Sequence, residues 1–381
     1  MSGSPISFAD LVSDGALKIG DGHRARLEEL TGGGPLFLRA GSLSDEGFSW
    51  EGLEEFGVES TTRLLGKIGQ AEDVVITTKG NSIGRVGFVP TGAPAFIYSP
   101  HLSFWRSLNR EVIHPRYLYY WSRSSAFMRQ LKNLAFGTDM APYFSLRDQA
   151  RVVIDLPRLA LQRSIAGVLE ALDDKIAVNY RLVDLLDETC ATEVRRALLG
   201  QENAVQLRDV LRLHYGKALP VSRRRSGKVA VYGSSGITGW HDEALVAAPG
   251  VVVGRKGSVG TVYWADGPHY PIDTTYYVES VGAIPAEVLY YILRTLPLSS
   301  LNNDSAVPGL NRDEAYAQHA LVPPAEVAAD LAAKVRRRFL RASVARHESD
   351  VLAATRDELL PLLMSGKVRV KDAEKVVEEV V

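Results

Sequence analysis

The stretch RLALQRSIAGVLEALDDKIAVNYRLVDLLDETCATEVRRALLG, from Arg158 to Gly200, decides the fold. Alternating steps of four and three residues along it meet an apolar side chain at seven of eight positions, which is the pattern of a coiled-coil seam. The exception is Asn179, and a buried Asn in such a seam fixes the register. The eight positions are Ile165, Leu169, Leu172, Ile176, Asn179, Val183, Leu186 and Cys190.

A second long helix is predicted near the end of the chain, with a weaker stripe whose apolar members include Leu331, Val335, Leu352 and Leu359. Pro361 is expected to kink or end it, and Ser365-Gly366 to stop it. Neither helix can bury its stripe alone, so the simplest solution is an antiparallel pair within the chain. Ordinary bundle helices and a zipper between two copies are the alternatives.

The remaining sequence repeats itself. VVITTKGNSIGRVGFV, from Val74 to Val89, resembles VVVGRKGSVGTVYW, from Val251 to Trp264. Asp10 is followed eight residues later by Lys18, and Asp209 likewise by Lys217. Proline-led helices are predicted over residues 115–134 and 285–296. Short β-branched runs that end at glycine indicate strands between them.

These features predict an α+β fold with two mixed α/β domains, separated by two long helices in an antiparallel intramolecular coiled coil. Because each globular domain precedes its helix, the two domains are expected at opposite ends, related by an approximate two-fold axis. The expected segments are 1–155, 156–200, 201–322 and 323–381.

Composition narrows the function classes. The chain has 381 residues and a net charge of −1, which is not the overall signature of a nucleic-acid binder. Locally, however, residues 200–230 contain seven Lys or Arg against two acids. A single cysteine and the lack of a long apolar run favour a cytoplasmic protein without a membrane span.

The glycine-rich loops do not match a nucleotide site, because their lysines precede the glycines and neither loop has the G-x-G-x-x-G pattern. Metal-ligand spacings and catalytic motifs are also missing from the sequence. We therefore expect no covalent chemistry, metal or cofactor in this chain. A nucleotide-binding enzyme with duplicated loops remains the alternative.

Several stretches together resemble the specificity subunit of Type I restriction–modification enzymes. They are LPRLALQRSIAGVLEALDDKIAVN (Leu156–Asn179), Tyr215–Lys217, Val231–Gly236, Gly254–Gly260, Pro271–Val278 and the late LLPLLMSGKVRV. The start of the second helix departs from the pattern, since it lacks a glutamine corresponding to Gln162.

The resemblance implies two target-recognition domains, each reading half of a split site in double-stranded DNA. It also implies two DNA adenine methyltransferase subunits on the helices, restriction and translocase subunits, and S-adenosylmethionine, ATP and Mg²⁺ on those partners. A scaffold that reads no DNA, or a specificity protein of another DNA-modifying defence system, would be the alternatives.

Candidate DNA-binding residues follow from their chemistry, since Lys and Arg neutralise phosphates while Arg, Asn and Ser reach base edges. For Tyr232, Tyr276 and Tyr277 we expect strand packing instead. The phosphate candidates are Lys79, Arg85, Lys217, Arg255 and Lys256, and the other candidates are Asn81, Ser82, Arg223, Arg224, Arg225, Ser234, Ser235 and Ser258.

If the helix pair sets the distance between the half-sites, lengthening it should change the spacer. Inserting about four residues, roughly one turn, at matching points in both helices is expected to alter the spacer length and leave both half-site sequences unchanged. Mapping the recognised sequence of the variant tests this, and an unaltered spacer would refute the ruler role.

Overall fold

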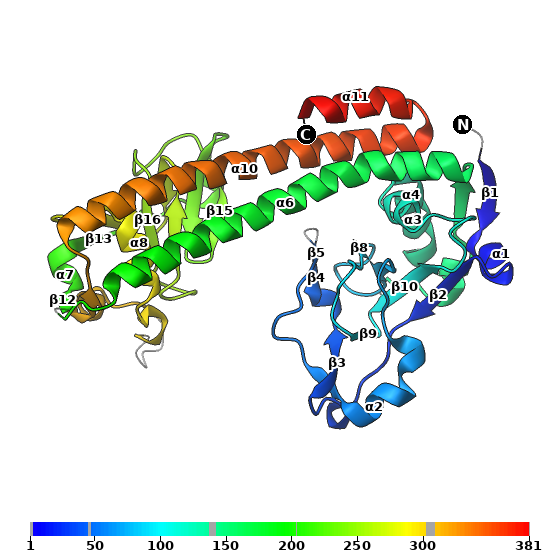
Figure 1. Cartoon of the computed structure of the whole chain (residues 1–381), viewed down its shortest axis with the longest axis horizontal. Helices are drawn as coiled ribbons and strands as arrows, with labels where there is room; N and C mark the ends of the chain where they lie inside the picture. Colours follow the sequence, from blue (N-terminus) through cyan, green and yellow to red (C-terminus); the bar gives the residue numbers. More distant parts are fainter. Residues whose placement is uncertain (1–2, 45–46, 137–141, 203, 302–308, 381) are drawn as a thin grey trace. The chain divides into compact units, whose positions relative to one another are not determined.

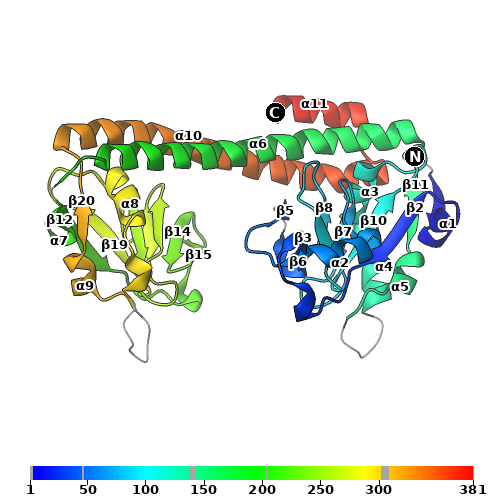
Figure 2. The same cartoon turned by 60° about the horizontal axis from the view of Figure 1, so that its bottom comes forward.

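The computed structural model describes residues 3–44, 47–136, 142–202, 204–301 and 309–380. Its contacts divide the chain into two units, Met1–Ile176 with Val351–Val381, and Ala177–Asp350. Both units contain part of the long helices α6 (Leu159–Leu198) and α10 (Ala325–Ser365), and unit 1 also contains α11 (Val370–Val380). We call the part of each unit outside these three helices its head (Figures 1 and 2).

The head of unit 1 contains β1 (Ser4–Ser7), α1 (Phe8–Ser13), β2 (Leu17–Asp21), β3 (Gly33–Leu38), β4 (Leu43–Ser44), β5 (Gly47–Phe48), β6 (Glu55–Gly57), α2 (Val58–Arg63), β7 (Val74–Thr77), β8 (Val86–Phe88), β9 (Phe96–Tyr98), β10 (Leu102–Ser107), α3 (Pro115–Ser122), α4 (Ser125–Ala135), α5 (Leu146–Ala150) and β11 (Val153–Leu156). The head of unit 2 contains β12 (Ala204–Gln206), α7 (Leu207–Val210), β13 (Leu211–Tyr215), β14 (Val229–Gly233), β15 (Gly236–His241), β16 (Gly250–Gly254), β17 (Val262–Ala265), β18 (His269–Pro271), β19 (Thr275–Ser280), α8 (Ala286–Arg294), α9 (Arg312–Ala317) and β20 (His319–Leu321).

Three sheets have the same topology in the two heads, and unit 1 has the small β4-β5 pair in addition. A four-stranded sheet has the order β2-β10-β7-β8 in unit 1 and β13-β19-β16-β17 in unit 2. A three-stranded sheet has the order β6-β3-β9 or β15-β14-β18, and its one parallel pair is β3 with β9 or β14 with β18. A two-stranded antiparallel sheet consists of β1 and β11 in unit 1 and of β12 and β20 in unit 2. The duplication predicted from the glycine loops therefore extends to all three of these shared sheets.

Strand register corrects one predicted match. Leu17 lies opposite Ser107, the last residue of β10, and Leu211 lies opposite Ser280, the last residue of β19. Leu17 and Leu211 are therefore equivalent, and Lys18 corresponds to Arg212. The match of Lys18 with Lys217, made from their spacing after an aspartate, was wrong. Three residues separate α1 from β2, whereas α7 runs directly into β13, so equal spacing in the sequence does not give equivalent positions.

The long helices pack on each other in antiparallel order. In unit 1 the start of α6 shares a core with the end of α10, and in unit 2 the end of α6 shares a core with the start of α10. The predicted antiparallel pair within the chain is confirmed. The buried members are Ile165, Leu169, Leu172 and Ile176 with Leu352, Leu359 and Leu363 in unit 1, and Cys190, Val194 and Leu198 with Leu331 and Val335 in unit 2; Val183 and Leu186 are half-buried.

Polar seam positions have partners on the opposite helix. The side-chain amide of Asn179 donates to Glu348 at 2.9 Å. The guanidinium of Arg338 donates to both carboxylate oxygens of Glu193, at 2.8 and 2.7 Å. In unit 1, Arg356 donates to Asp173 at 2.7 Å. Asn179, Arg338 and Arg356 can therefore lie between the two helices, because each of these polar side chains keeps a hydrogen-bond partner there.

Two helix boundaries differ from the predictions. Residues 115–134 form two helices, because the Ser124 hydroxyl accepts a hydrogen bond from the backbone N–H of Phe127 and caps a new helix. Pro361 was expected to kink or end the second helix, and α10 continues through it, so the helix does not end there. It ends at Ser365 as predicted, followed by Gly366 at a positive φ of 72°.

Leu169 is fully buried in the core of unit 1, so truncating it should leave a cavity. We expect Leu169→Ala to lower the free energy of unfolding by about 3 kcal/mol, measured by urea denaturation. The matched control is Leu185→Ala on the same helix, because Leu185 is 60% exposed and its loss should cost under about 0.5 kcal/mol. Equal losses in the two variants would contradict the assigned seam.

Candidate nucleic-acid interface

Two loops meet at one short segment in each head. The linker loop is residues 22–30 in unit 1 and 216–224 in unit 2. The glycine loop is residues 79–85 and 256–261. The anchor segment is residues 98–102 and 271–275. The sheet register makes these three segments equivalent in the two units.

The linker loop begins with two backbone hydrogen bonds to the anchor segment. In unit 1 the N–H of Gly22 donates to Leu102 at 3.1 Å and that of His23 to Tyr98 at 2.7 Å. In unit 2 the N–H of Gly216 donates to Thr275 and that of Lys217 to Pro271, both at 3.1 Å. The structure therefore equates His23 with Lys217.

The first residue of the linker loop must be glycine in both units. A Cβ on Gly22 would overlap the backbone of Ser99, and a Cβ on Gly216 would overlap the backbone of Ile272. Since backbone atoms cannot move aside as a flexible side chain can, the close approach depends on the missing side chain.

The glycine loop is tied to the other side of the anchor segment. The N–H of Thr78 donates to His101 at 2.8 Å, and the N–H of Arg255 donates to Thr274 at 2.8 Å. Gly80 and Gly257, which follow the two lysines, have φ values of 80° and 81°, a conformation that favours glycine. Equivalent backbone bonds thus join both loops to the anchor segment in the two units, although the side chains of the loops differ.

In unit 2 an aromatic ring organises the basic side chains. The guanidinium of Arg255 donates to the carbonyl of Asp273 at 2.9 Å and lies 5.1 Å from the ring centroid of Tyr215. The guanidinium of Arg312 lies 5.2 Å from the same centroid. Lys217 and Lys256 are exposed on the two loops beside this cluster. Two cations over one ring form a positively charged surface with fixed geometry.

The three consecutive arginines have different surroundings. Arg223 is exposed, whereas Arg224 donates to the carbonyl of Thr238 on β15 at 2.7 Å. Arg225 pairs with Asp242 at 2.7 Å and Glu243 at 2.8 Å, so two nearby acids compensate its charge. Of the three predicted base-contacting arginines, Arg223 is therefore the most available to a ligand.

The predicted serines of unit 2 lie near the glycine loop. The Ser234 carbonyl accepts a hydrogen bond from the Thr261 hydroxyl at 2.6 Å, which places the β14–β15 turn against the loop. A Cβ on Gly257 would lie 3.1 Å from the Ser234 hydroxyl oxygen. Ser235 and Ser258 are exposed. The structure thus brings Ser234 together with Lys256 and Ser258.

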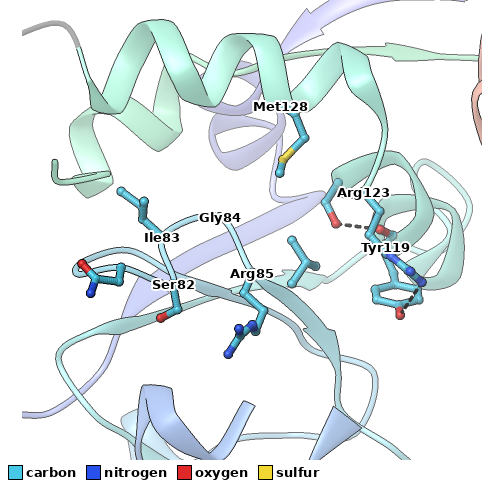
Figure 3. A pocket seen from close by; sticks show the side chains of 10 residues that line it. Ser82, Ile83, Gly84, Arg85, Tyr119, Arg123 and Met128 are labelled. Atoms are coloured by element: carbon cyan, nitrogen blue, oxygen red, sulfur yellow. Dashed lines mark hydrogen bonds between the residues drawn. The ribbon is translucent and has the colours of Figure 1, made fainter. Parts of the chain in front are cut away.

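In unit 1 the predicted residues diverge. The Lys79 ammonium lies 4.2 Å from the ring centroid of Tyr143, and Asn81 is exposed. Arg85 is half-buried and donates to the carbonyl of Leu43 at 2.7 Å. Ser82, Arg85, Tyr119 and Arg123 line a cavity of about 350 Å³ (Figure 3). The side chain of Arg85 points away from Tyr119 and Arg123. Arg85 thus helps to hold the β3–β6 connection.

Each head is fastened to α6 by a phenol and a carboxylate. The hydroxyl of Tyr120 on α3 donates to Asp173 at 2.7 Å, and the hydroxyl of Tyr291 on α8 donates to Asp187 at 2.9 Å. Burial raises the pKa of both phenols well above the ordinary tyrosine range, and the adjacent carboxylates raise these pKa values further. Both phenols therefore remain protonated donors at neutral pH.

The part of the chain that the structure describes contains no cluster of three or more His, Cys, Asp or Glu side chains able to hold a metal ion. Across the same residues, no helix is both long and apolar enough to cross a membrane.

Sequence reasoning missed Tyr143, Tyr215, Arg312 and the linker loop as a repeated element. Tyr215 and Arg312 are far apart in the sequence, and no local pattern joins them. A usable signal did exist for the linker loop, because a glycine directly follows the first strand of the four-stranded sheet in both halves, at Gly22 and Gly216.

Among solved structures, the chain is similar to a Type I restriction–modification S subunit from M. genitalium, with 16% identity and a TM-score of 0.60 over 94% of this chain and 95% of that chain. The HsdS subunit from Thermoanaerobacter tengcongensis matches with 16% identity over 96% of this chain and 97% of that chain, at a TM-score of 0.38. A chain solved to explain complex assembly and conformational transition of the type I R-M system matches with the same identity and coverages, at a TM-score of 0.39.

No family model and no curated protein matches the sequence. The match to the M. genitalium subunit nevertheless spans nearly the whole of both chains. The chain therefore has the fold of a Type I S subunit, and the resemblance inferred from its sequence is confirmed at the level of the fold.

Tyr276 holds the segment that starts α9, because its hydroxyl donates to the carbonyl of Leu310 at 3.0 Å. The N–H of Leu310 in turn donates to the carbonyl of Arg255, just before the glycine loop, at 2.8 Å. Burial, aided by the Tyr215 phenol, raises the pKa of Tyr276 to about 12. The folded chain thus keeps this proton at pH values where the unfolded chain loses it. The stabilisation is complete below the ordinary tyrosine pKa and declines as the pH rises towards 12.

We expect Tyr276→Phe to lower the free energy of unfolding by about 1 kcal/mol near neutral pH, since one hydrogen bond is lost. The gap between the variant and the parent should shrink as the pH rises from about 8 to about 11. Urea denaturation at both pH values measures it, with Tyr277→Phe as the control, because the Tyr277 ring stacks on His214 instead. A gap that is the same at both pH values would contradict this account.

Proposed function

We propose that this chain is the DNA-recognition subunit of a restriction–modification complex and that each unit reads one half of a bipartite site in double-stranded DNA. The observation that carries the proposal is the repeated site, in which two loops are fixed by equivalent backbone bonds in each unit and carry different side chains. A duplicated scaffold with unlike loops suits a target made of two unlike half-sites.

The chemistry of the loops suits a nucleic acid. Lys217, Arg223 and Lys256 are exposed on the loops of unit 2, where they can neutralise phosphates. The Arg255 guanidinium is oriented by Tyr215 and by the Asp273 carbonyl, which lowers the entropy cost of placing it at a phosphate or a guanine edge. Asn81 and Ser235, both exposed, are candidates for contacts to bases.

The proposal also assigns the chain its partners. Two DNA adenine methyltransferase subunits would dock on the helices α6 and α10, and restriction and translocase subunits would join them in the cytoplasm. S-adenosylmethionine, ATP and Mg²⁺ would be bound by those partners, so this chain would supply recognition and assembly without catalysis. The likeness in fold to S subunits supports this assignment.

The direct test is a genome-wide map of methylated bases in cells with and without the gene, with the methylating partner expressed in both. We expect a split motif, two short half-sites around a fixed gap, that disappears when the gene is deleted. An unchanged map would contradict the proposal and favour a scaffold that reads no DNA. As a control, restoring the gene should restore the same motif.

A further inference from the structure

One position of the linker loop exposes an aliphatic side chain in both units. Leu27 is 84% exposed and Val221 is 76% exposed. Of all the large apolar side chains in the described residues, these two are the most exposed. Burying an aliphatic side chain of this size is favourable, so two such residues at equivalent positions indicate a ligand that covers them.

The two residues are structurally equivalent. Each lies six residues after the end of the preceding strand, which is Asp21 for Leu27 and Tyr215 for Val221. Each is the first residue of a 3₁₀ turn, closed by a hydrogen bond of 3.1 Å to its carbonyl from the N–H of Leu30 or Arg224. The identical start of the two loops at the anchor segment makes this match independent of sequence alignment.

Side-chain contacts hold the turns that carry Leu27 and Val221. In unit 1, the Glu29 carboxylate accepts a hydrogen bond from the backbone N–H of Arg26 at 2.8 Å and pairs with Arg63 and His23. In unit 2, the Arg224 guanidinium joins the turn to Leu219 at 3.3 Å and to Thr238 on β15 at 2.7 Å. Side-chain contacts that differ in the two units thus hold the same backbone turn.

The residues around Leu27 and Val221 favour duplex DNA as the ligand. Arg24 and Arg26 are exposed beside Leu27, and Arg223 is exposed two residues after Val221. The exposed Glu28, which pairs with Arg26 at 3.3 Å, also lies beside Leu27. An aliphatic side chain with arginines nearby suits a nucleic-acid groove, where it can contact a thymine methyl group or wedge against a base step.

We propose that Leu27 and Val221 are apolar tips through which the two units contact the bases of their half-sites. The inference rests on the proposed DNA-reading function and adds a specificity-determining residue to each unit. Because an aliphatic side chain neutralises no phosphate, the contact should affect sequence preference while leaving the salt dependence of binding unchanged.

The test uses the full chain in complex with its methylating partner and a labelled duplex carrying the mapped site. Dissociation constants are measured by fluorescence anisotropy at several salt concentrations, for the intact duplex and for duplexes with base changes in either half-site. The tip variants are Leu27→Ala and Val221→Ala. The control variants are Val58→Ala and Leu199→Ala, since these side chains are 67% and 73% exposed but lie outside the linker loops.

Each tip variant is expected to weaken binding of the intact site by about five- to thirty-fold. Each should also reduce discrimination between bases in one half-site only, Leu27→Ala in one half and Val221→Ala in the other. The slope of affinity against salt should remain that of the parent, whereas Lys256→Gln should lower that slope by about one. The two control variants should bind as the parent does.

Three results would overturn the inference. Unchanged affinity and discrimination in both tip variants, with normal preference in the parent, would remove the tips from the interface and leave the proposed function intact. A tip variant that loses its methylating partner but discriminates bases normally would assign the tip to a protein contact. A parent complex without any sequence preference would refute the proposed function itself.

Discussion

The burial of the apolar stripe of α6 is the constraint on which the rest of the structure depends. A helix of 40 residues obtains most of its stability in water from tertiary packing of such a stripe. Here α10 supplies that packing in both units, with its end in unit 1 and its start in unit 2. The pairs Arg338–Glu193 and Arg356–Asp173 then favour this register, since a slip of one turn would separate the half-buried charges of each pair.

The heads solve a different problem, which is to hold loops firmly while their side chains remain variable. Hydrogen bonds from Gly22 and Gly216 fix one loop, and those from Thr78 and Arg255 fix the other, all through backbone atoms. Substitutions elsewhere in the loops therefore leave these bonds in place. The phenol–carboxylate contacts of Tyr120 and Tyr291 fasten each head to α6, the helix that the seam stabilises.

The sequence predicted those features that depend on periodicity or on local repetition. The seam from Ile165 to Cys190 follows from the spacing of apolar residues, and the duplication follows from the paired glycine loops. The Tyr215–Arg255–Arg312 cluster could not be predicted, because its members come from three separate segments and meet only after folding. Lys18 was misplaced because the two halves differ in length before the first strand of the sheet. Arg85 remains a predicted phosphate contact, and the hydrogen bond from its guanidinium to the Leu43 carbonyl was not indicated by any local pattern.

The two units also differ in charge at equivalent positions. Residues 216–228 contain five Lys or Arg and no acid, whereas residues 22–32 contain two Arg and two Glu. In addition, the carboxylate of Glu29 is engaged by Arg63, His23 and the Arg26 N–H, so its charge serves the fold of the loop. On the proposed function, unit 2 releases more counterions on binding and carries more of the salt-dependent affinity. Unit 1 must then depend more on hydrogen bonds and apolar contacts, which salt screens far less. A modest net charge is thus compatible with DNA binding, because the positive charge is concentrated where unit 2 presents its loops.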